Sequence, residues 1–249
     1  MVESSTELEK FRTAQKGNVM KTTISTRQAA LIAGWGLFFM TLFAIYPFNF
    51  IFPNLIVSED AGMTVKNISE NELQFRIGIC SYLIVIILDV LVAWALYVFL
   101  KPINMNISLL TAWFRLIYAA IYGVALVNYF HVLKLLSSTE YLNILGTDQF
   151  NVQIMLSLNA FHDTWAMGLV LFGIHLVLLG YLAIKSAYVP KILGILLTIA
   201  GASYLIDYSI QFLFPGINFP ISTYLGWGEL IFMFWLLFKG GKTLSYETE

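Results

Sequence analysis

Residues 161–207 read FHDTWAMGLVLFGIHLVLLGYLAIKSAYVPKILGILLTIAGASYLID. Two apolar runs, each long enough to cross a bilayer, flank a short basic turn, so the segment predicts two membrane helices. The segment also carries two of the chain's three histidines and two aspartates in apolar surroundings: His162, Asp163, His175 and Asp207. These polar side chains are the first candidates for a site inside a membrane.

The whole chain has the composition of a membrane protein. Of its 249 residues, 59% are hydrophobic and 12% are charged, whereas soluble domains are roughly 45–50% apolar and about 25% charged. The net charge of −1 provides no basic field for nucleic acid. Cys80 is the one cysteine, which excludes an internal disulfide and a Cys/His zinc motif. Lipid is therefore the expected solvent.

Six apolar runs predict an all-α integral membrane bundle of six transmembrane helices. Each run has roughly the ~20 residues that a bilayer requires. We expect a polar amino-terminal segment (1–28), a membrane domain (29–240) and a short tail (241–249). The predicted spans cover about residues 29–50, 76–100, 107–132, 159–184, 192–214 and 222–238.

The segments between the spans are expected to be mostly irregular. Residues 51–74 are interpreted as a polar loop, in which Ser69-Glu70-Asn71-Glu72 fits a capping box and predicts a helix start. Residues 134–151 are interpreted as a second loop, followed by an interfacial piece up to about residue 158. Pro215, Gly216 and Pro220 are expected to break the chain before the last span, and no span is expected to be a broken helix.

The basic residues predict that both termini are cytoplasmic, in a bacterial cytoplasmic (inner) membrane. With six spans, ten Lys and Arg residues fall on the side of the termini and three on the other side. The run that follows Met20 is too long for a signal peptide and is interpreted as a retained span, although Met1 and Met20 are both candidate starts. The ten are Lys10, Arg12, Lys16, Lys21, Arg27, Lys101, Lys185, Lys191, Lys239 and Lys242, and the three are Lys66, Arg76 and Lys134.

Four ionisable residues on four helices fall at a common depth. Their distances from the nearest cytoplasmic turn, at ~1.5 Å per residue, are ~18 Å for Asp89, ~16 Å for Arg115, and ~15 Å for His175 and Glu229. Because ionisable groups are costly in lipid, we expect all four to face one interior volume near the midplane. Tyr118 and Tyr122 follow Arg115 on one helix face and are expected on its wall, whereas Trp165 is interpreted as an interfacial residue.

Asp89 and Arg115 are expected to form an ion pair, since their helices are neighbours across the tight turn at 101–104. This pair could fix helix register, or it could anchor a charged group of a ligand. Two carboxylates against one fixed cation leave room for one more positive charge: a proton on Glu229, a proton on His175, or a cationic ligand. The centre is accordingly either a dry polar plug or a hydrated pocket.

A second, outer layer of polar residues suggests a metal-dependent alternative. His162 and Asp207, from successive spans, are residue types that can ligate a metal. No HExxH or HxH spacing occurs, so no metal or other cofactor is indicated by a specific motif, and no catalytic residue is assigned. Gly173 and Gly180, like Gly194 and Gly201, are seven residues apart, which predicts close helix packing.

Short motifs along residues 29 to 240 resemble a prokaryotic family of multi-pass membrane proteins known as domain of unknown function 4386. Asp89, Arg115, His162, His175, Asp207 and Glu229 fall on the pattern of that family, and Asp163 departs from it. The resemblance implies a membrane fold and no particular activity. The motifs include Phe75-Arg76-Ile77-Gly78, Leu88-Asp89-Val90, Lys101-Pro102-Ile103-Asn104, Phe114-Arg115-Leu116, Phe172-Gly173-Ile174-His175, Pro190-Lys191-Ile192-Leu193-Gly194 and Gly228-Glu229-Leu230.

Three functions remain open from the sequence. The first is a bundle that binds or transports a small ligand, an ion or a proton at the polar centre. The second is an intramembrane, metal-dependent enzyme that uses His162 and Asp207, with His175 as a third candidate. The third is a structural or partner-binding membrane protein. The lipid bilayer is the expected partner, a homodimer or another membrane partner could supply further spans, and the small ligand is unknown.

The six-span arrangement predicts the outcome of topology mapping. Reporter fusions at Lys101, Ser186 and the carboxyl terminus should report the cytoplasm, and fusions near Met63 and Thr139 should report the outside. A single inverted signal among the three middle positions (Lys101, Thr139 and Ser186) would break the six-span arrangement.

Overall fold

The computed structural model describes residues 24–214, 216–217 and 220–241, and its regular elements in these ranges are all helical. Six helical segments are long and apolar enough to cross a membrane, which confirms the predicted all-α bundle of six spans. The elements are α2 (Thr26–Tyr46), η1 (Pro47–Ile51), α3 (Phe52–Leu55), α4 (Ala61–Glu70), α5 (Glu72–Leu100), α6 (Met105–Leu136), α7 (Thr139–Lys185), α8 (Lys191–Leu213), α9 (Ile221–Leu225) and α10 (Gly228–Phe238).

Some sequence predictions lie outside the described residues. The first is the amino-terminal segment up to residue 23, which contains both candidate starts and four of the basic residues: Lys10, Arg12, Lys16 and Lys21. The others are Pro215 and the tail from Lys242 onward.

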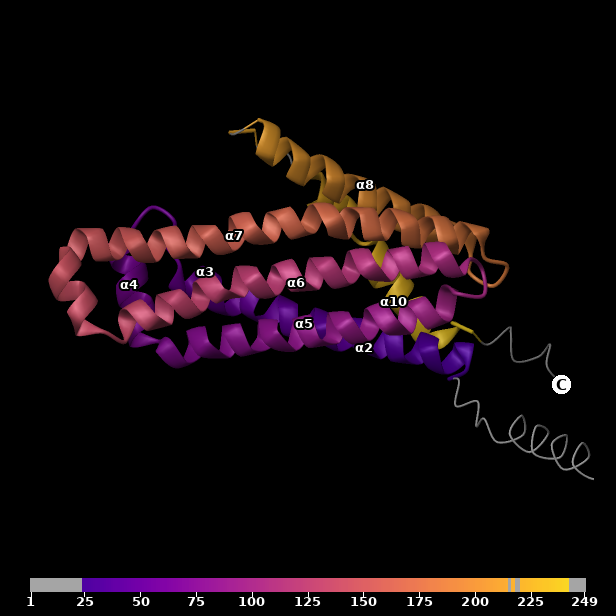
Figure 1. Ribbon diagram of the computed structural model, residues 1–249, viewed down its shortest axis with the longest axis horizontal. Helices are drawn as coiled ribbons and strands as arrows, with labels where there is room; N and C mark the ends of the chain where they lie inside the picture. The colour runs from indigo at the N-terminus through magenta and orange to yellow at the C-terminus, as the bar shows by residue number, and fades with distance from the viewer. Residues whose placement is uncertain (1–23, 215, 218–219, 242–249) are drawn as a thin grey trace, which may run out of the picture.

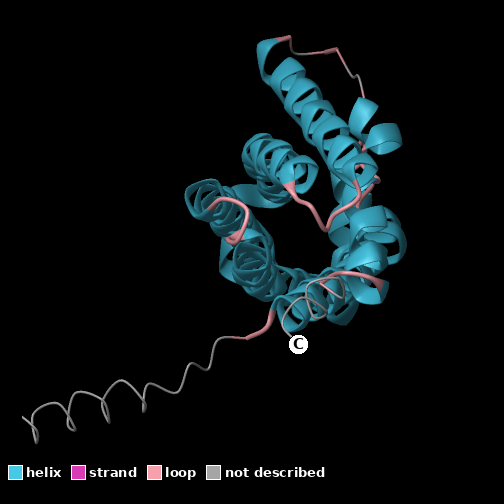
Figure 2. Ribbon diagram, turned by 90° about the vertical axis from the view of Figure 1, so that its right-hand side faces the viewer, coloured by secondary structure: helices cyan, strands magenta, loops and turns pink. Residues whose placement is uncertain are grey.

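The six spans pack in a closed order around a shared interior. Along this order α2 packs against α5, α5 against α6, α6 against α7, α7 against α8, α8 against α10, and α10 against α2 again. Figure 2 looks along the bundle and shows the helices arranged as a ring. Figure 1 shows that α2 begins and α10 ends at the same end of the bundle, where the α5–α6 and α7–α8 turns also lie. Side chains from every span can therefore point to one centre.

The first span is longer than predicted and changes helix type near its end. It runs from Thr26 to Leu55 rather than from 29 to 50. Ser25 caps it in a reciprocal box with Gln28, with Gln28 N to Ser25 Oγ at 3.1 Å and Ser25 N to Gln28 Oε1 at 2.8 Å. Pro47, which has no N–H, begins the π-helical turn η1, and Pro53 occupies the first turn of α3, where its missing N–H is tolerated. The prolines therefore reshape the span instead of ending it.

The predicted polar loop at 51–74 is wrong, because α4 occupies much of it. Asp60 caps α4 by accepting a hydrogen bond from Met63 N at 2.8 Å. The predicted capping box is also wrong: Ser69 lies inside α4, and the next helix begins at Glu72 after Asn71, which makes no side-chain cap. The buried side of α4 consists of Thr64 and Ile68, four residues apart. This narrow stripe explains why the segment has a polar composition.

The predicted loop at 134–151 and the interfacial piece up to 158 are replaced by helix. The helix α6 continues to Leu136, and α7 extends over 47 residues with a kink at Gly146, where φ is 73°. At ~1.5 Å per residue the part after the kink is about 58 Å long, well beyond a hydrocarbon core of about 30 Å. Its first turns pack against α4. A helix that projects beyond lipid needs no continuous apolar run, which is why residues 134–151 were interpreted as a loop.

The last span is a broken helix, contrary to expectation. The short α9 ends at Leu225, and α10 begins at Gly228 and has 11 residues, about 16 Å. Gly228 lies directly against α8, since a Cβ at this position would be 2.5 Å from Leu196 O. Because α10 crosses only about half of the core, its first turn lies at membrane depth.

The turn between α7 and α8 is pinned to α5. The hydroxyl of Tyr188 donates a hydrogen bond to Phe99 O at 2.7 Å, and Ser186 Oγ accepts hydrogen bonds from Tyr188 N and Val189 N, both at 3.2 Å. Burial raises the pKa of Tyr188 to about 12, so the hydroxyl keeps the proton that it donates.

The glycines of α7 and α8 bring the two backbones together, as predicted. A Cβ on Gly201 would lie 2.6 Å from Gly173 O, and a Cβ on Gly194 would lie 2.7 Å from Gly180 O. Since the atoms in the way belong to the backbone, no side-chain rotation could relieve these contacts.

We predict that Gly180→Ala destabilises the bundle by about 1–3 kcal/mol, because the added methyl group would meet Gly194 O at 2.6 Å. Thermal unfolding of the purified protein in detergent measures this. Gly123→Ala on α6 is the matched control, since a Cβ there meets nothing within 4 Å. Alanine favours a helix over glycine by up to about 1 kcal/mol, so the control should be neutral or stabilising. Equal effects of the two changes would contradict the close-packing account.

Candidate functional site

The centre of the ring is built on Arg115, which is fully buried on α6. Asp89, 1% exposed, projects toward it from α5. Arg115 Nε and Nη2 both donate to Asp89 Oδ1 at 2.9 Å. The predicted ion pair is thereby confirmed. The two residues meet because the turn at 101–104 holds α5 and α6 antiparallel, with both residues at similar distances from it.

Arg115 also contacts three further helices. Its Nη1 donates to Glu229 Oε1 on α10 at 2.6 Å and to His175 Nε2 on α7 at 3.1 Å. Its Nη2 contacts Met40 Sδ on α2 at 3.8 Å. A guanidinium has five N–H donors, and these contacts give each of them an acceptor. Such complete pairing is what makes a buried charge tolerable.

The contacts of His175 define its tautomer. His175 Nδ1 lies 2.8 Å from Thr111 O, and a carbonyl can only accept, so Nδ1 carries the proton. Its Nε2 faces the Arg115 guanidinium, which can only donate, so Nε2 must present a lone pair. The imidazole is therefore neutral and holds Arg115 in place. A proton on His175 is therefore excluded as the source of the additional positive charge, which leaves a proton on Glu229 or a cationic ligand.

A cavity of about 270 Å³ lies beside this network. Its wall includes three of the four predicted centre residues, Asp89, Arg115 and Glu229, together with both predicted tyrosines, Tyr118 and Tyr122. His175 is fully buried behind Arg115 and is not part of the wall. The centre is thus a pocket and not a fully packed plug.

The carboxylates keep acceptor capacity toward the cavity. Arg115 uses Asp89 Oδ1 and Glu229 Oε1. Within the described residues 24–214, 216–217 and 220–241, no hydrogen bond reaches Asp89 Oδ2 or Glu229 Oε2, and no buried side-chain polar atom lacks a partner. Both oxygens are consequently accessible, and the cavity is what they face. With ionised carboxylates, a guanidinium and a neutral imidazole, the centre carries a net charge of −1.

Aromatic rings form the rest of the wall. The rings of Tyr118 and Tyr122 are stacked with their centroids 6.0 Å apart, and those of Tyr122 and Trp165 are stacked at 5.8 Å. Trp165 Nε1 donates to the Tyr118 hydroxyl at 3.3 Å. Trp165 therefore lines the cavity, which the interpretation as an interfacial residue did not predict. Its helical spacing with Leu169 and Phe172, which also line the cavity, is the sequence signal that could have placed it.

Met40, Thr111 and Tyr204 belong to the centre but were not found by sequence reasoning. Met40 and Thr111 contribute one sulfur and one carbonyl to the Arg115 network, and Tyr204 lines the cavity from α8. A methionine and a backbone carbonyl have no distinctive pattern in an apolar sequence, so only the fold identifies them.

Two further hollows adjoin the cavity and extend away from the end that holds the α2 start. The first, about 240 Å³, shares Ala44, Ile45, Tyr122 and Trp165 with it. The second, about 310 Å³, shares Phe48 and Tyr82 with the first and reaches Asn49 and His162. The three hollows therefore share wall residues and follow one another from the charged centre toward the opposite end.

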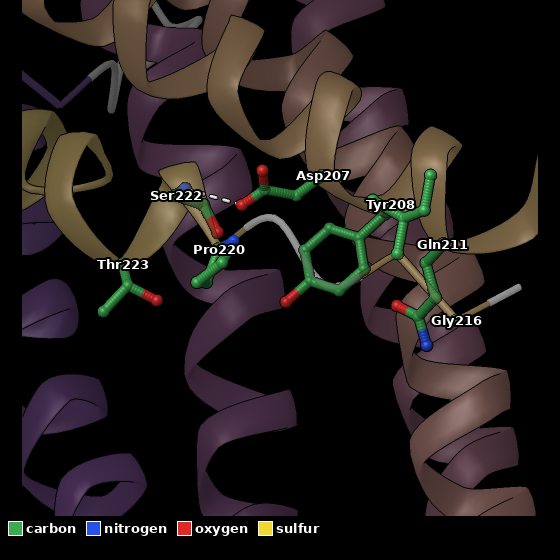
Figure 3. A pocket seen from close by; sticks show the side chains of 8 residues that line it. Asp207, Tyr208, Gln211, Gly216, Pro220, Ser222 and Thr223 are labelled. Carbon is green, nitrogen blue, oxygen red and sulfur yellow. Dashed lines mark hydrogen bonds between the residues drawn. The ribbon is translucent and has the colours of Figure 1, made fainter. Parts of the chain in front are cut away.

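Asp207 caps a short helix, whereas the sequence suggested it as a metal ligand. Its Oδ1 and Oδ2 accept hydrogen bonds from Ile221 N at 3.0 Å and Ser222 N at 2.6 Å, so it caps the start of α9. Figure 3 shows the hydrogen bond to Ser222. It lines a hollow of about 430 Å³ with Tyr208 and Gln211. This hollow is larger than the cavity at Arg115, but its carboxylate is already engaged by backbone.

The structure does not bring His162 and Asp207 together. His162 lines the hollow beside Asn49, and Asp163 is exposed. Among the described residues no group of three or more His, Cys, Asp or Glu side chains could hold a metal ion. The predicted pair of metal ligands is therefore not assembled.

Comparisons with known proteins agree with this architecture. A family model described as "Domain of unknown function (DUF4386)" matches residues 32–240, which include all six spans in whole or in part and the entire Arg115 network. A protein of Archaeoglobus fulgidus described as uncharacterized is 39% identical over 165 residues, which cover 66% of this chain and 85% of that protein. No solved structure matches the chain. The resemblance noted in the sequence is confirmed.

We predict that Arg115→Ala destabilises the protein by about 3–5 kcal/mol, because it leaves two carboxylates facing each other without a cation. Adding Asp89→Asn should recover part of the loss, since it removes one of these charges. Thermal unfolding in detergent measures both. Arg76→Ala serves as control: Arg76 pairs with Glu72 on the surface, with side chains 51% and 45% exposed, and such pairs contribute about 1 kcal/mol or less. A double variant less stable than Arg115→Ala would contradict the charge argument.

Proposed function

We propose that this chain, which belongs to the family described as domain of unknown function DUF4386, binds a small ligand inside the membrane, in the cavity beside Arg115. The observation that carries the proposal is the cavity itself, about 270 Å³, with Asp89, Arg115 and Glu229 in its wall. Ionisable groups at membrane depth are costly, and in membrane proteins they mark ligand and ion pathways. If the network served only to fix helix register, we would expect the surrounding side chains to pack against its charged groups and to leave no cavity.

Two irregularities, the π-helical turn in the first span and the break in the last span, favour a transport-like bundle over a static receptor. Thr41, Ala44 and Ile45 line the cavity just before the π-helical turn η1. Gly226 and Glu229 line it on either side of the break between α9 and α10. Transporters commonly place their sites beside such discontinuous helices, where exposed backbone and half-helix ends meet the substrate. The α10 amino terminus, with its partial positive charge, lies next to Glu229.

We further propose that the protein lies in the bacterial cytoplasmic membrane with both termini in the cytoplasm. The excess of Lys and Arg on the side of the termini supports this orientation. The adjoining hollows lead from the centre toward Asn49 and His162, at the end away from the termini. In this orientation the cavity communicates with the outside.

Cysteine labelling tests the hydration and the sidedness of the cavity. In a Cys80→Ser background, Thr41→Cys places a thiol on the cavity wall and Ile87→Cys places one on the lipid-facing side of α5, where Ile87 is 68% exposed. Both positions are roughly 20 Å from the cytoplasmic ends of their helices, at ~1.5 Å per residue. We expect a charged, impermeant thiol reagent added to intact cells to label Thr41→Cys and to leave Ile87→Cys unlabelled.

Other outcomes have distinct meanings. No labelling of Thr41→Cys in intact cells or in inverted vesicles would contradict a hydrated cavity and with it the proposed function. Labelling in inverted vesicles alone would keep the cavity and reverse its sidedness.

A further inference from the structure

We infer that the ligand is a small organic cation with a single positive charge and an apolar body, of the quaternary ammonium type. The inference rests on the proposed function, since it names the class of ligand for the same cavity. Three features of the cavity carry it: its charge, its aromatic wall and its shape.

The charge of the centre requires one additional positive charge. Asp89 and Glu229 present two carboxylates, and among the described residues Arg115 is the one cation in contact with both. His175 cannot contribute, because the Thr111 carbonyl and the guanidinium fix it as a neutral imidazole. All five donors of Arg115 are engaged, so it has no donor left for an anionic ligand. The accessible Glu229 carboxylate, with a side chain 16% exposed, is the natural partner of an entering cation.

The aromatic wall suits a cation that has few polar hydrogens. Cations are attracted to the faces of Trp, Tyr and Phe within about 6 Å, and quaternary ammonium ions are recognised in this way. The centre already contains one such contact, with Arg115 Cζ 5.5 Å from the centroid of Phe172. Tyr118, Tyr122, Trp165 and Tyr204 surround the remaining space.

An unpartnered hydroxyl supports the presence of a ligand independently of charge. Tyr122 is 3% exposed and lines the cavity, and its hydroxyl has no hydrogen bond to another described residue. Since no buried polar side-chain atom in that part of the chain lacks a partner, this hydroxyl is accessible from the cavity. A group of the ligand or a water molecule is what it can bind.

The shape distinguishes an organic cation from a metal ion. Hard inorganic cations bind about six to eight oxygen ligands at short distance, whereas this wall is mainly aromatic and aliphatic. The volume, about 270 Å³, is close to the lower end of ligand pockets, roughly 300–1,000 Å³. The adjoining hollow of about 240 Å³, lined by Ala44, Phe48 and Phe161, extends it with an apolar surface. The charged group therefore lies at Glu229 and the apolar body along this extension.

A matched pair of probes tests the inference on the full-length protein in lipid nanodiscs. Phenyltrimethylammonium carries a permanent charge, and tert-butylbenzene has the same shape without it. Titration calorimetry, corrected with empty nanodiscs, should give saturable binding of the cation at least tenfold tighter than of the neutral compound. Two probes of equal affinity would overturn the charge assignment while leaving cavity binding intact.

Variants locate the binding. Glu229→Gln removes the negative charge but keeps an amide oxygen for Arg115, and it should weaken cation binding tenfold or more. Trp165→Leu should weaken it several-fold through loss of an aromatic face. Glu140→Gln, an exposed glutamate outside the cavity, should leave it unchanged. The unfolding temperature and the elution volume in size-exclusion chromatography identify any variant that fails to fold. If Glu229→Gln fails to fold, cation binding by Trp165→Leu, which removes no charge, still tests whether the cation binds in this cavity.

The failure of this inference is distinguishable from failure of the proposed function. If Thr41→Cys is labelled but the cation does not bind, the cavity is hydrated and the ligand class is wrong; the positive charge is then a proton on Glu229. If the cation binds equally well to Glu229→Gln and Trp165→Leu, it binds elsewhere, and the assignment to this cavity is wrong. If Thr41→Cys is not labelled, the proposed function itself fails.

Discussion

A fully buried guanidinium is tolerable only when every N–H has an acceptor. Arg115 meets this condition with acceptors from four other helices, α2, α5, α7 and α10. Because these acceptors come from four helices, the pairing of Arg115 depends on the ring arrangement. Lipid gives little driving force for helices to associate, and this network adds directional contacts between five helices, beside the glycine contacts that join α7 to α8.

The same network also leaves hydrogen-bond acceptors that Arg115 does not use. Arg115 takes one oxygen from each carboxylate, and the second oxygen of each faces the cavity. The residues that hold the helices in register are thus the residues that would receive a ligand. A register function and a binding function, which are alternatives when only the sequence is considered, are compatible in this geometry. Glu229 connects them most directly, because the broken last span places it in the first turn of α10 at the cavity.

The sequence predicted the centre because helices convert residue number into depth. Asp89 and Arg115 are nearly equidistant from a tight turn, and this alone brings them together. The errors have physical causes as well. Helix α4 and the first turns of α7, up to about residue 151, bury too few side chains to give an apolar run; in α4 these are Thr64 and Ile68. The break before Gly228 depends on how closely α10 packs on α8, and the tautomer of His175 depends on a carbonyl of another helix. None of these is encoded in local composition.

Arg27 joins the first and the last described helices of the ring. Arg27, near the start of α2, donates hydrogen bonds to Leu236 O, Leu237 O and Gly240 O and so caps α10. A Cβ on Gly241, where φ is 71°, would lie 2.8 Å from Arg27 Cα. The first and last described helices therefore meet where they leave the bundle. The helices follow one another around the ring nearly in their order along the chain, and the last one lies beside the first. In such a ring the position of the chain ends is arbitrary. A short linker between residues 24 and 241, with new ends opened at the α6–α7 connection, would give a circular permutant that retains every neighbour pair in the ring.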